Sequence, residues 1–361
     1  MEIAVDIGRA TERQTRRSRY ALAAFATVLL AAFFFAVGHG AVAIAPLETL
    51  AIFLGQLGLD VLGGYQGVQE MVLLAIRLPR AVLALLAGAA LAVAGAALQG
   101  LFRNPLADPG LIGVSNGSAL AAGAAIVFGG ALLGVLPVWL SAGLLPLAAF
   151  LGGLATTLIV YRIASRDGRT EVATMLLAGI ALNALAAAGI GLLVFMSDDQ
   201  QLRDLQFWLL GGLGGVTWNS LLSAAPLILA PTLLLALFSR QLNALLLGET
   251  EATHLGFDVE RTKHWIIVLA ALAVGASVAL TGVIGFIGLV VPHLVRLMIG
   301  PDHRTLLPAS ILLGAALLLL ADLVARTIVL PAELPVGILT SCIGGPFFLW
   351  LLIRRRCLGM W

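Results

Sequence analysis

Long stretches of this sequence carry no charge, and this absence constrains the fold more than any motif does. Between Asp108 and Arg162 lie 53 residues without an Asp, Glu, Lys or Arg, and residues 205–239 and 265–295 are also uncharged. An apolar segment of about 20 residues is long enough to cross the hydrocarbon core of a bilayer as an α-helix. The chain is therefore expected to be an all-α, polytopic integral membrane protein.

The composition agrees with a membrane location. Of the 361 residues, 60% are hydrophobic and 11% are charged, and the mean hydropathy is +1.05. Soluble domains contain about 25% charged residues, so a soluble enzyme and a nucleic-acid-binding domain are excluded. The net charge of +2 is too small to indicate a polyanionic partner. Cys342 and Cys357 form neither a disulfide framework nor a metal-ligand pattern.

The spacing of charges, glycines and prolines predicts about ten transmembrane helices. We expect these helices at residues 20–45, 81–102, two within 109–161 with a turn marked by Pro137 and Pro146, 172–197, 218–238, two within 265–298 with a break at Gly282, Gly285 and Gly288, 305–324 and 334–353. The run of glycines at 211–215 is too flexible for a plain helix. The transmembrane domain then covers 20–353, flanked by cytoplasmic tails at 1–19 and 354–361, and 241–263 is the longest inner loop.

The distribution of basic residues predicts the orientation of the chain. With ten spans, 17 of the 21 Lys and Arg residues lie on the side of the two termini, and Arg77, Arg80, Arg203 and Arg326 lie on the other. Because cytoplasmic loops are rich in Lys and Arg, both termini are expected in the cytoplasm. The first apolar stretch is longer than the core of a signal peptide, which favours an uncleaved first helix over a cleaved leader.

The residues needed for nucleotide binding or ion coupling are scarce. Lys263 is the only lysine and does not lie in a glycine-rich phosphate-binding loop, so any ATP hydrolysis belongs to another subunit. Buried ionisable groups usually mark ion-coupled transport, and the candidates are Asp322 and His293. Asp322 also fits an ion pair with Arg326 at i, i+4, and His293 fits a hydrogen-bonded helix histidine. An ion-coupled transporter is thus disfavoured, and a channel stays open on composition alone.

Three of the outer arginines, Arg77, Arg80 and Arg326, lie at the ends of predicted helices. Arginine forms bidentate pairs with carboxylates, so these side chains could dock an acidic partner. The alternative is that they extend to lipid phosphates at the membrane surface.

Two loops have unusual sequences. Residues 246–256 form a short amphipathic segment that ends at a glycine. Such a protrusion could be held by another protein, or it could be a solvated surface helix. In residues 101–110, prolines follow Asn104 and Asp108 and interrupt helix. Irregular backbone near the membrane must line protein or a water cavity, so we expect this loop to fold toward a central pathway.

A faint internal similarity links residues 83–98 with residues 268–280. The first segment begins outside and the second inside, as in an inverted repeat of helices 2–5 and 7–10. Chance similarity between alanine-rich helices is the competing explanation.

Three longer motifs resemble a known family. They are RLPRAVLALLAGAALAVAGAALQGLFRNPLADPGLIGVSNG (77–117), GFIGLVVPHLVRL (285–297) and LLADLVARTIVLPAELPVGILTSCIGGPFFLWLL (319–352). From about residue 20 onward, the chain is similar to the membrane subunits of type II ABC importers, the permeases for ferric siderophores, haem and cobalamin. The resemblance implies a ten-helix permease of the bacterial inner membrane. It also implies a homodimer, two cytoplasmic ATP-binding subunits and a periplasmic binding protein for haem or another iron chelate.

The resemblance also implies roles for individual residues. Those matching the arginines that meet glutamates of the binding protein are Arg77, Arg80 and Arg326. Those matching the coupling helix that enters the ATPase are Glu249, Glu251, Ala252 and Gly256. Those matching cytoplasmic gate segments are Asn104, Pro105, Leu106, Thr170 and Thr174. The coupling segment, GETEATHLG, departs from the family's Glu-Ala-Ala pattern because Thr250 and Thr253 interrupt it.

Residues 198–218, DDQQLRDLQFWLLGGLGGVTW, resemble the haem-uptake permeases. The expected substrate is therefore haem, with a ferric siderophore or cobalamin as the alternative, and an ion-coupled secondary transporter as the rival class. On this interpretation the chain itself holds no cofactor or metal. ATP and magnesium bind to the partner ATPase, and the other contacts are with membrane lipid rather than nucleic acid.

Overall fold

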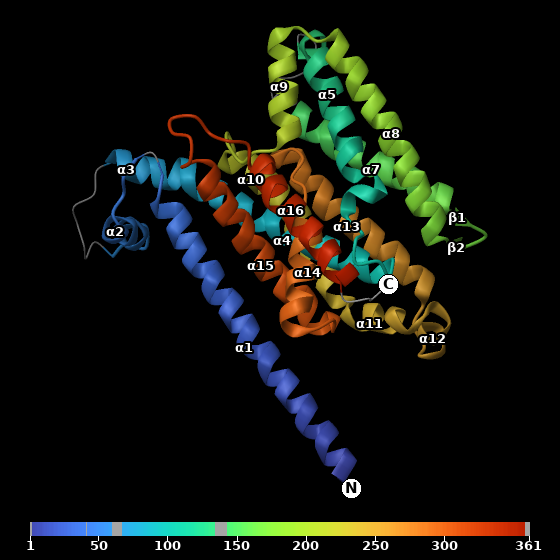
Figure 1. Cartoon of the computed structure of the whole chain (residues 1–361). Coiled ribbons are helices and arrows are strands. Elements are labelled where there is room, and N and C mark those ends of the chain that lie inside the picture. Colours follow the sequence, from blue (N-terminus) through green and yellow to red (C-terminus); the bar gives the residue numbers. More distant parts are fainter. Residues whose placement is uncertain (1, 41, 60–66, 134–142, 358–361) are drawn as a thin grey trace.

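A computed structural model describes residues 2–40, 42–59, 67–133 and 143–357 of this chain (Figure 1). Helices dominate this part of the chain, and an antiparallel strand pair joins two of them: β1 (Ser165–Arg166) and β2 (Arg169–Thr170). The helices are α1 (Glu2–Gly38), α2 (Pro46–Gln56), α3 (Gly67–Met71), the π-helical turn η1 (Val72–Arg77), α4 (Leu78–Leu101), the 3₁₀ turn η2 (Pro109–Ile112), α5 (Val114–Leu133), α7 (Leu144–Ala164), α8 (Val172–Met196), α9 (Asp199–Leu210), α10 (Trp218–Leu237), α11 (Ser239–Leu247), α12 (Glu249–His254), α13 (Val259–Thr281), α14 (Ile287–Ile299), α15 (His303–Ala325) and α16 (Val336–Cys357).

The predicted spans all overlap apolar helices of the structure. Among the described residues, seven helical segments are long and apolar enough to cross a bilayer, and three shorter apolar helices accompany them. The shorter ones lie in α5, α14 and α16, at 114–130, 287–299 and 336–351. The all-α, multi-pass fold is therefore confirmed. The orientation of the termini stays a prediction.

Several predicted boundaries differ from the structure. Helix α1 begins at Glu2 and α16 continues to Cys357, so much of each predicted tail is helical. Pro146 lies in the first turn of α7 rather than in the preceding connection. A proline is tolerated there because the first amides of a helix have no intrahelical acceptor. Pro137 and residues 358–361 lie outside the described residues.

The glycine-rich run at 211–215 is not helical, as predicted. Asp198 caps the preceding helix α9 by accepting hydrogen bonds from the amides of Gln200 and Gln201 at 2.9 and 2.8 Å. Gly211 ends α9 with a positive φ of 69° and packs against the backbone of Val283. A side chain would be strained in that backbone conformation and would meet the Val283 carbonyl. The run therefore turns the chain sharply between α9 and α10.

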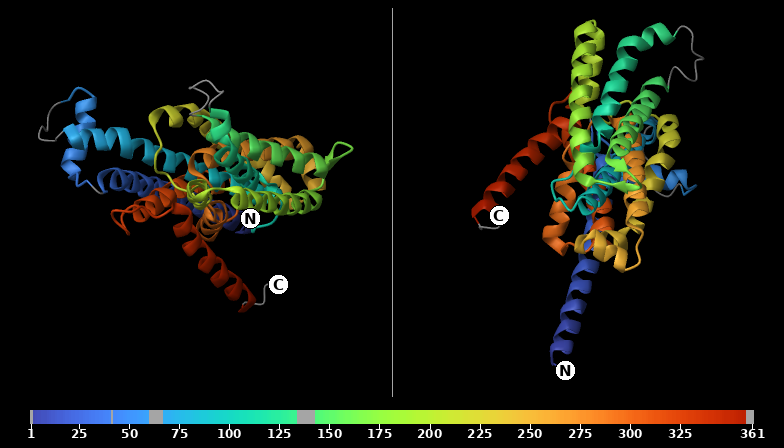
Figure 2. Two further views of the ribbon diagram at one scale, coloured as in Figure 1. Left: turned by 90° about the horizontal axis from the view of Figure 1, so that it is seen from above. Right: turned by 90° about the vertical axis from the view of Figure 1, so that its right-hand side faces the viewer.

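Helix α4 is the centre of the molecule. In the most apolar 18-residue stretch of residues 67–101, which include α4, 89% of the residues are buried. The corresponding stretch of α8 is 17% buried. Helices α10, α13, α14 and α15 pack around α4. Helices α5, α7, α8 and α9 form a second group beside them, which α13 contacts (Figure 1). The N-terminal part of α1 projects beyond the other helices, and α16 leaves the bundle at an angle (Figure 2).

Glycines allow α4 to approach its neighbours closely. Gly88 faces the backbone of Gly314 in α15, and Gly95 faces the backbone of Gly288 in α14. A Cβ atom at either position of α4 would collide with a backbone carbonyl of the facing glycine. Small residues drive this kind of helix association in membranes, where lipid removes the hydrophobic contribution and close van der Waals packing remains.

The two segments of the predicted inverted repeat form the two most buried candidate spans. Residues 83–98 lie in α4 and residues 268–280 lie in α13. The most apolar stretches of the spans that contain them, 67–101 and 259–281, are 89% and 72% buried. The shared burial explains why both are rich in alanine, and the repeat itself stays a prediction.

The packing of α4 leads to a stability prediction. Gly95→Ala should destabilise the protein by about 1–3 kcal/mol because the added methyl group overpacks a backbone contact. The control is Gly191→Ala, since a Cβ atom at Gly191 in α8 meets nothing within 4 Å. That control should be neutral or slightly stabilising, because alanine is the better helix former. Thermal unfolding of the two purified variants in detergent measures the difference, and equal midpoints would contradict the role of Gly95.

Candidate functional site

The three outer arginines lie at one end of the molecule and are buried. Arg77 and Arg80 lie where η1 meets α4, and Arg326 follows the last residue of α15. This end is opposite to α11 and α12 (Figure 1). Burial and internal hydrogen bonding do not fit the alternative in which these side chains extend to lipid phosphates. The docking role stays a prediction.

Arg80 is held by two carboxylates. Its Nε lies 3.0 Å from Oδ1 of Asp322 and its Nη2 lies 2.9 Å from the same oxygen. Its Nη1 donates to both carboxylate oxygens of Glu333, at 2.9 and 2.8 Å. The two acids differ in environment, because the Asp322 side chain is 2% exposed and the Glu333 side chain is 53% exposed. Arg80 therefore has one internal partner and one at the surface.

Arg77 and Arg326 complete the C-terminal end of α1. Arg77 donates to the carbonyls of Val37 and Gly38 at 3.1 and 2.8 Å, and Arg326 donates to the carbonyl of Ala36. The last carbonyls of a helix have no intrahelical donor and carry partial negative charge. The two guanidinium groups donate hydrogen bonds to these carbonyls and place positive charge beside their partial negative charge. These contacts explain why arginine is present on the side of the chain that is otherwise poor in basic residues.

The predicted pair between Asp322 and Arg326 exists, but it is the weaker contact of Asp322. Arg326 Nε lies 3.6 Å from Oδ2 of Asp322, which is too long for a hydrogen bond. Arg80, which precedes Asp322 by 242 positions, is closer. Helical spacing identifies only neighbours within one helix, so the sequence did not indicate the longer-range partner.

A cavity of about 400 Å³ opens beside this arginine cluster. Its walls come from the end of α9, the glycine run, the break after α13 and the start of α16, and they include Arg80, Glu333, Asp204, Phe207 and Trp208. Among the described residues that line it there is no histidine or tyrosine. The cavity thus combines aromatic side chains with a few charges, and part of its wall belongs to residues 198–218.

At the other end, the predicted coupling segment forms two short helices separated by Gly248. Ala252 of α12 is buried and Glu251 is exposed. Gly256 follows α12 with a positive φ of 86° and its amide donates to the carbonyl of Thr253. The predicted glycine stop at Gly256 is therefore confirmed, whereas the break at Gly248 divides the segment that was expected to be one short helix. Two leucines beside it, Leu247 and Leu255, are 67% and 60% exposed. Both leucines lie outside the candidate spans.

The loop after α4 is irregular, as predicted. Asn104 accepts a hydrogen bond from the amide of Leu106 at 2.9 Å, and its own amide donates to the carbonyl of Gln99 at 3.1 Å. Pro105 lies between them, and Leu106 is exposed. Desolvation raises the pKa of the Asp108 carboxyl, and the hydrogen bond from the Gly110 amide partly offsets this shift.

The chain that follows the loop after α4 contacts α8 through Asn183, a residue that the sequence did not single out. Asn183 of α8 donates to the carbonyl of Gly110 at 3.0 Å. One turn earlier, Gly179 of α8 packs directly against the carbonyl of Leu111. Asn183 is a polar side chain in the middle of an otherwise apolar helix, which was a usable signal. The loop after α4 and helix α8 therefore form one contact.

The other predicted gate residues lie at the start of α8. Thr170 is buried in β2, and its hydroxyl lies 3.0 Å from that of Ser165. Thr174 donates to Glu171 at 2.6 Å. Thr170 also contacts Lys263 and Glu260 of α13, and Lys263 in turn contacts Glu249 of the coupling segment. The sequence placed the gate and coupling residues in separate loops, and the structure joins them through α13.

His293 packs among aromatic side chains. It is buried in α14, and its ring lies 6.0 Å from the ring of Phe347 at an interplanar angle of 71°. Within the described residues, no group of three or more His, Cys, Asp or Glu side chains could hold a metal ion. His293 is thus part of the packing between α14 and α16.

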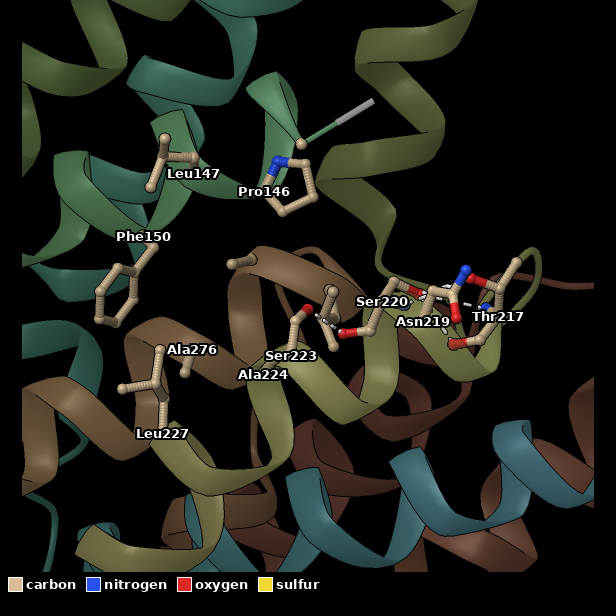
Figure 3. Close-up of a pocket in the computed structure, with 13 residues that line it drawn as sticks. Pro146, Leu147, Phe150, Thr217, Asn219, Ser220, Ser223, Ala224, Leu227 and Ala276 are labelled. Carbon is tan, nitrogen blue, oxygen red and sulfur yellow. Dashed lines mark hydrogen bonds between the residues drawn. The ribbon is translucent and has the colours of Figure 1, made fainter. Parts of the chain in front are cut away.

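A second cavity, of about 480 Å³, lies between α7, α10 and α13 (Figure 3). Pro146, Leu147 and Phe150 face Ala224 and Leu227 across it. Its hydroxyl groups bond within the first turns of α10, since Ser223 donates to the carbonyl of Ser220 at 2.8 Å. The lining carries no charge, and the hydroxyl groups of Thr217, Ser220 and Ser223 bond to one another or to the backbone at the start of α10, so this cavity is not the candidate site.

A bundle of membrane-spanning helices, with a charged cavity at one end and a protruding helix pair at the other, defines a multi-pass transport protein. The chain belongs to the FecCD transport family, which it matches over residues 28–354.

Known relatives are transport permeases. The chain is 53% identical to the hemin transport system permease protein HmuU of Yersinia pestis over 281 residues, which cover 78% of this chain and 83% of that protein. It is 45% identical to the cobalamin import system permease protein BtuC of Halobacterium salinarum over 81% of this chain and 76% of the relative. It is 46% identical to the vitamin B12 import system permease protein BtuC of Escherichia coli O9:H4, over 80% and 85% of the two chains.

A solved structure supports the same conclusion. A metal-chelate type ABC transporter in an inward-facing conformation aligns with a TM-score of 0.79 and 33% identity, over 92% of this chain and 98% of that chain. The chain is therefore a permease of an ABC importer of the inner membrane, and ATP hydrolysis belongs to separate subunits. The rival assignment as an ion-coupled secondary transporter is wrong.

Proposed function

We propose that this permease imports haem from a periplasmic binding protein into the cytoplasm. The observation that carries this proposal is the position of residues 198–218, the segment that resembles haem-uptake permeases, because several of its residues line the charged cavity. The higher identity to a hemin permease than to cobalamin permeases supports the same choice. A ferric siderophore or cobalamin is the alternative within the family.

The cavity has aromatic surface that suits a flat, apolar ring. Phe207 and Trp208 supply this surface, and the charged groups at the wall are Arg80, Asp204 and Glu333. Apolar pockets with a few placed polar groups are typical of small-molecule sites. A cavity without strong iron ligands also suits a pathway that must release its cargo.

We propose that two copies of the chain form the pathway between them and that two ATP-binding subunits dock on the α11–α12 pairs. Helices α8 and α16 carry many exposed apolar side chains, among them Leu185, Phe195, Ile343 and Leu349. Helix α8 belongs to the same group as α9, and α16 contacts α9, so their exposed faces suit a second copy. ATP-driven closure of the ATPase subunits then moves α12 and rocks the two permeases.

Uptake by the complete complex tests the substrate. The permease, with the ATPase and binding protein with which it co-purifies, is reconstituted in proteoliposomes with ATP inside. Haem, a ferric siderophore and cobalamin are offered separately. We expect ATP-dependent accumulation of haem at the highest rate. Faster uptake of either of the other two would overturn the haem assignment and leave the family assignment intact.

The coupling surface has its own test. Glu251→Arg should detach or uncouple the ATPase, because it reverses a charge at the exposed face of α12 while Ala252 stays buried. The measurement is substrate-stimulated ATP hydrolysis together with retention of the ATPase on the tagged permease. Arg17→Glu, a charge reversal at an exposed position of α1 outside the α11–α12 pair, is the control. Full retention and full coupling in Glu251→Arg would show that α12 is not the contact.

Docking of the binding protein requires a change at Arg80. Its exposed partner, Glu333, occupies the face of the guanidinium that a carboxylate of the binding protein would take. We propose that such a carboxylate displaces Glu333, while the buried Asp322 keeps Arg80 in place. Arg77 and Arg326 then support the site by holding the end of α1 against it.

This competition leads to a measurable result. Glu333→Gln should strengthen binding-protein docking by about two- to fivefold, because an exposed ion pair contributes roughly 0.2–1 kcal/mol and its loss frees Arg80. Asp204→Asn removes a charge from the same cavity without touching Arg80 and controls for general electrostatics. Surface-immobilised binding protein and permease in nanodiscs give the two dissociation constants at matched salt. Equal effects of both variants would rule out the competition.

A further inference from the structure

Lys263, the only lysine of the chain, is buried at the start of α13. It is 2% exposed, and its Nζ donates three hydrogen bonds. The acceptors are the carbonyl of Thr170 at 2.9 Å, Oε2 of Glu249 at 2.8 Å and Oε1 of Glu260 at 3.0 Å. A lysine ammonium group has three protons to donate, so every one of them is used.

Glu260 makes a second contact between this cluster and Thr170, which lies in the β1–β2 strand pair. Its second oxygen, Oε2, accepts a hydrogen bond from the amide of Thr170 at 2.8 Å. Both backbone polar groups of Thr170 are therefore bound by the Lys263–Glu260 pair, one by each partner. The strand β2 that contains Thr170 leads directly into α8. The position of the first turn of α8 is thus tied to α13.

Glu249 ties the same cation to the coupling segment. It is the first residue of α12, and it is 14 positions from Lys263, whereas Thr170 is 93 positions away. Helices α12 and α13 are consecutive, whereas β2 is distant in sequence and belongs to a different loop. One ammonium group joins the surface proposed to receive the ATPase to the segment proposed to gate the pathway.

We propose that Lys263 is the positioning residue that transmits movement of α12 to the start of α8. This inference rests on the proposed coupling role of α12 and deepens it. When the ATPase displaces α12, Glu249 moves with it, and Lys263 must either follow or lose a partner. A buried ammonium group with a missing partner is strongly unfavourable. Lys263 is therefore favoured to move together with Glu249. Its contacts with the Thr170 carbonyl and with Glu260 then transmit the displacement to β2 and α8.

The competing explanation is that Lys263 only stabilises the fold. A stabilising role predicts that variants lose assembly, ATP hydrolysis and uptake together. A transmitting role predicts a change in the number of substrate molecules moved per ATP hydrolysed, with the ATPase still bound. The ratio of uptake to hydrolysis therefore separates the two explanations.

The experiment uses the complete complex in proteoliposomes, with the substrate that the unaltered protein transports. Lys263→Met keeps much of the side-chain volume and removes the charge and all three hydrogen bonds. Lys263→Arg keeps the charge and the donors. Arg261→Met is the matched control, because Arg261 lies two positions away on α13 and its side chain is 83% exposed. Measured quantities are ATPase retention, ATP hydrolysis, uptake, and hydrogen exchange of the peptide that contains Thr170.

We expect Lys263→Met to retain the ATPase and to lower the uptake-to-hydrolysis ratio by about tenfold, within the range of typical coupling between sites. Exchange at Thr170 should rise and should no longer respond to ATP. Lys263→Arg should restore most of the ratio, and Arg261→Met should leave it unchanged. An unaltered ratio in Lys263→Met, or a loss of uptake matched by an equal loss of hydrolysis, would overturn the inference.

A second variant keeps the test decisive if Lys263→Met does not assemble. Glu260→Gln removes one charge and weakens the link to Thr170 but leaves the Lys263–Glu249 pair in place. It should also lower the ratio, and an unchanged ratio there would overturn the inference. If the unaltered complex binds no ATPase or shows no ATP-dependent uptake, the proposed function fails instead, whatever the variants do.

Discussion

Close packing of backbones around α4 is the constraint on which the rest of the structure depends. In lipid there is no hydrophobic driving force for helix association, so association depends on contact area and on small residues that let helices approach closely. Gly88 and Gly95 supply that approach on two sides of α4, toward Gly314 and Gly288. With α4 in the centre, the ends of α13, α14 and α15 are placed where the charged groups meet.

Two clusters of ion pairs around buried cations, Arg80 and Lys263, lie in different parts of the bundle. The start of α4, which holds Arg80, and helix α12 beside Lys263 lie at opposite ends (Figure 1). Arg80 joins α4 to Asp322 of α15 and to Glu333 of the following loop. Lys263 joins α13 to α12 and to β2. In each cluster a buried cation holds elements that are distant in sequence. Because breaking a buried pair is costly, each cluster fixes the elements that it joins relative to one another.

Much of the fold could be predicted from the sequence, because a helix needs about 20 residues to cross the bilayer and charged residues are costly within the membrane. The uncharged runs located the apolar helices, and glycines located the breaks at 211–215 and after Thr281. The glycine stop of the coupling segment at Gly256 also followed from local pattern, but the break at Gly248 did not. Boundaries were less predictable, since α1 and α16 extend through basic residues that suit a helix as well as a tail.

The sequence by itself determined the class of protein, the approximate spans and the residues whose charge had to be explained, because these depend on composition and spacing along the chain. Only the tertiary structure decided the partners of those charges. Arg80 lies 242 positions from Asp322, and Lys263 lies 93 positions from Thr170. No helical periodicity relates positions so far apart, and helix packing alone brings them together. Helix packing likewise brings Asn183 to Gly110 and Glu333 to Arg80, which are 73 and 253 positions apart.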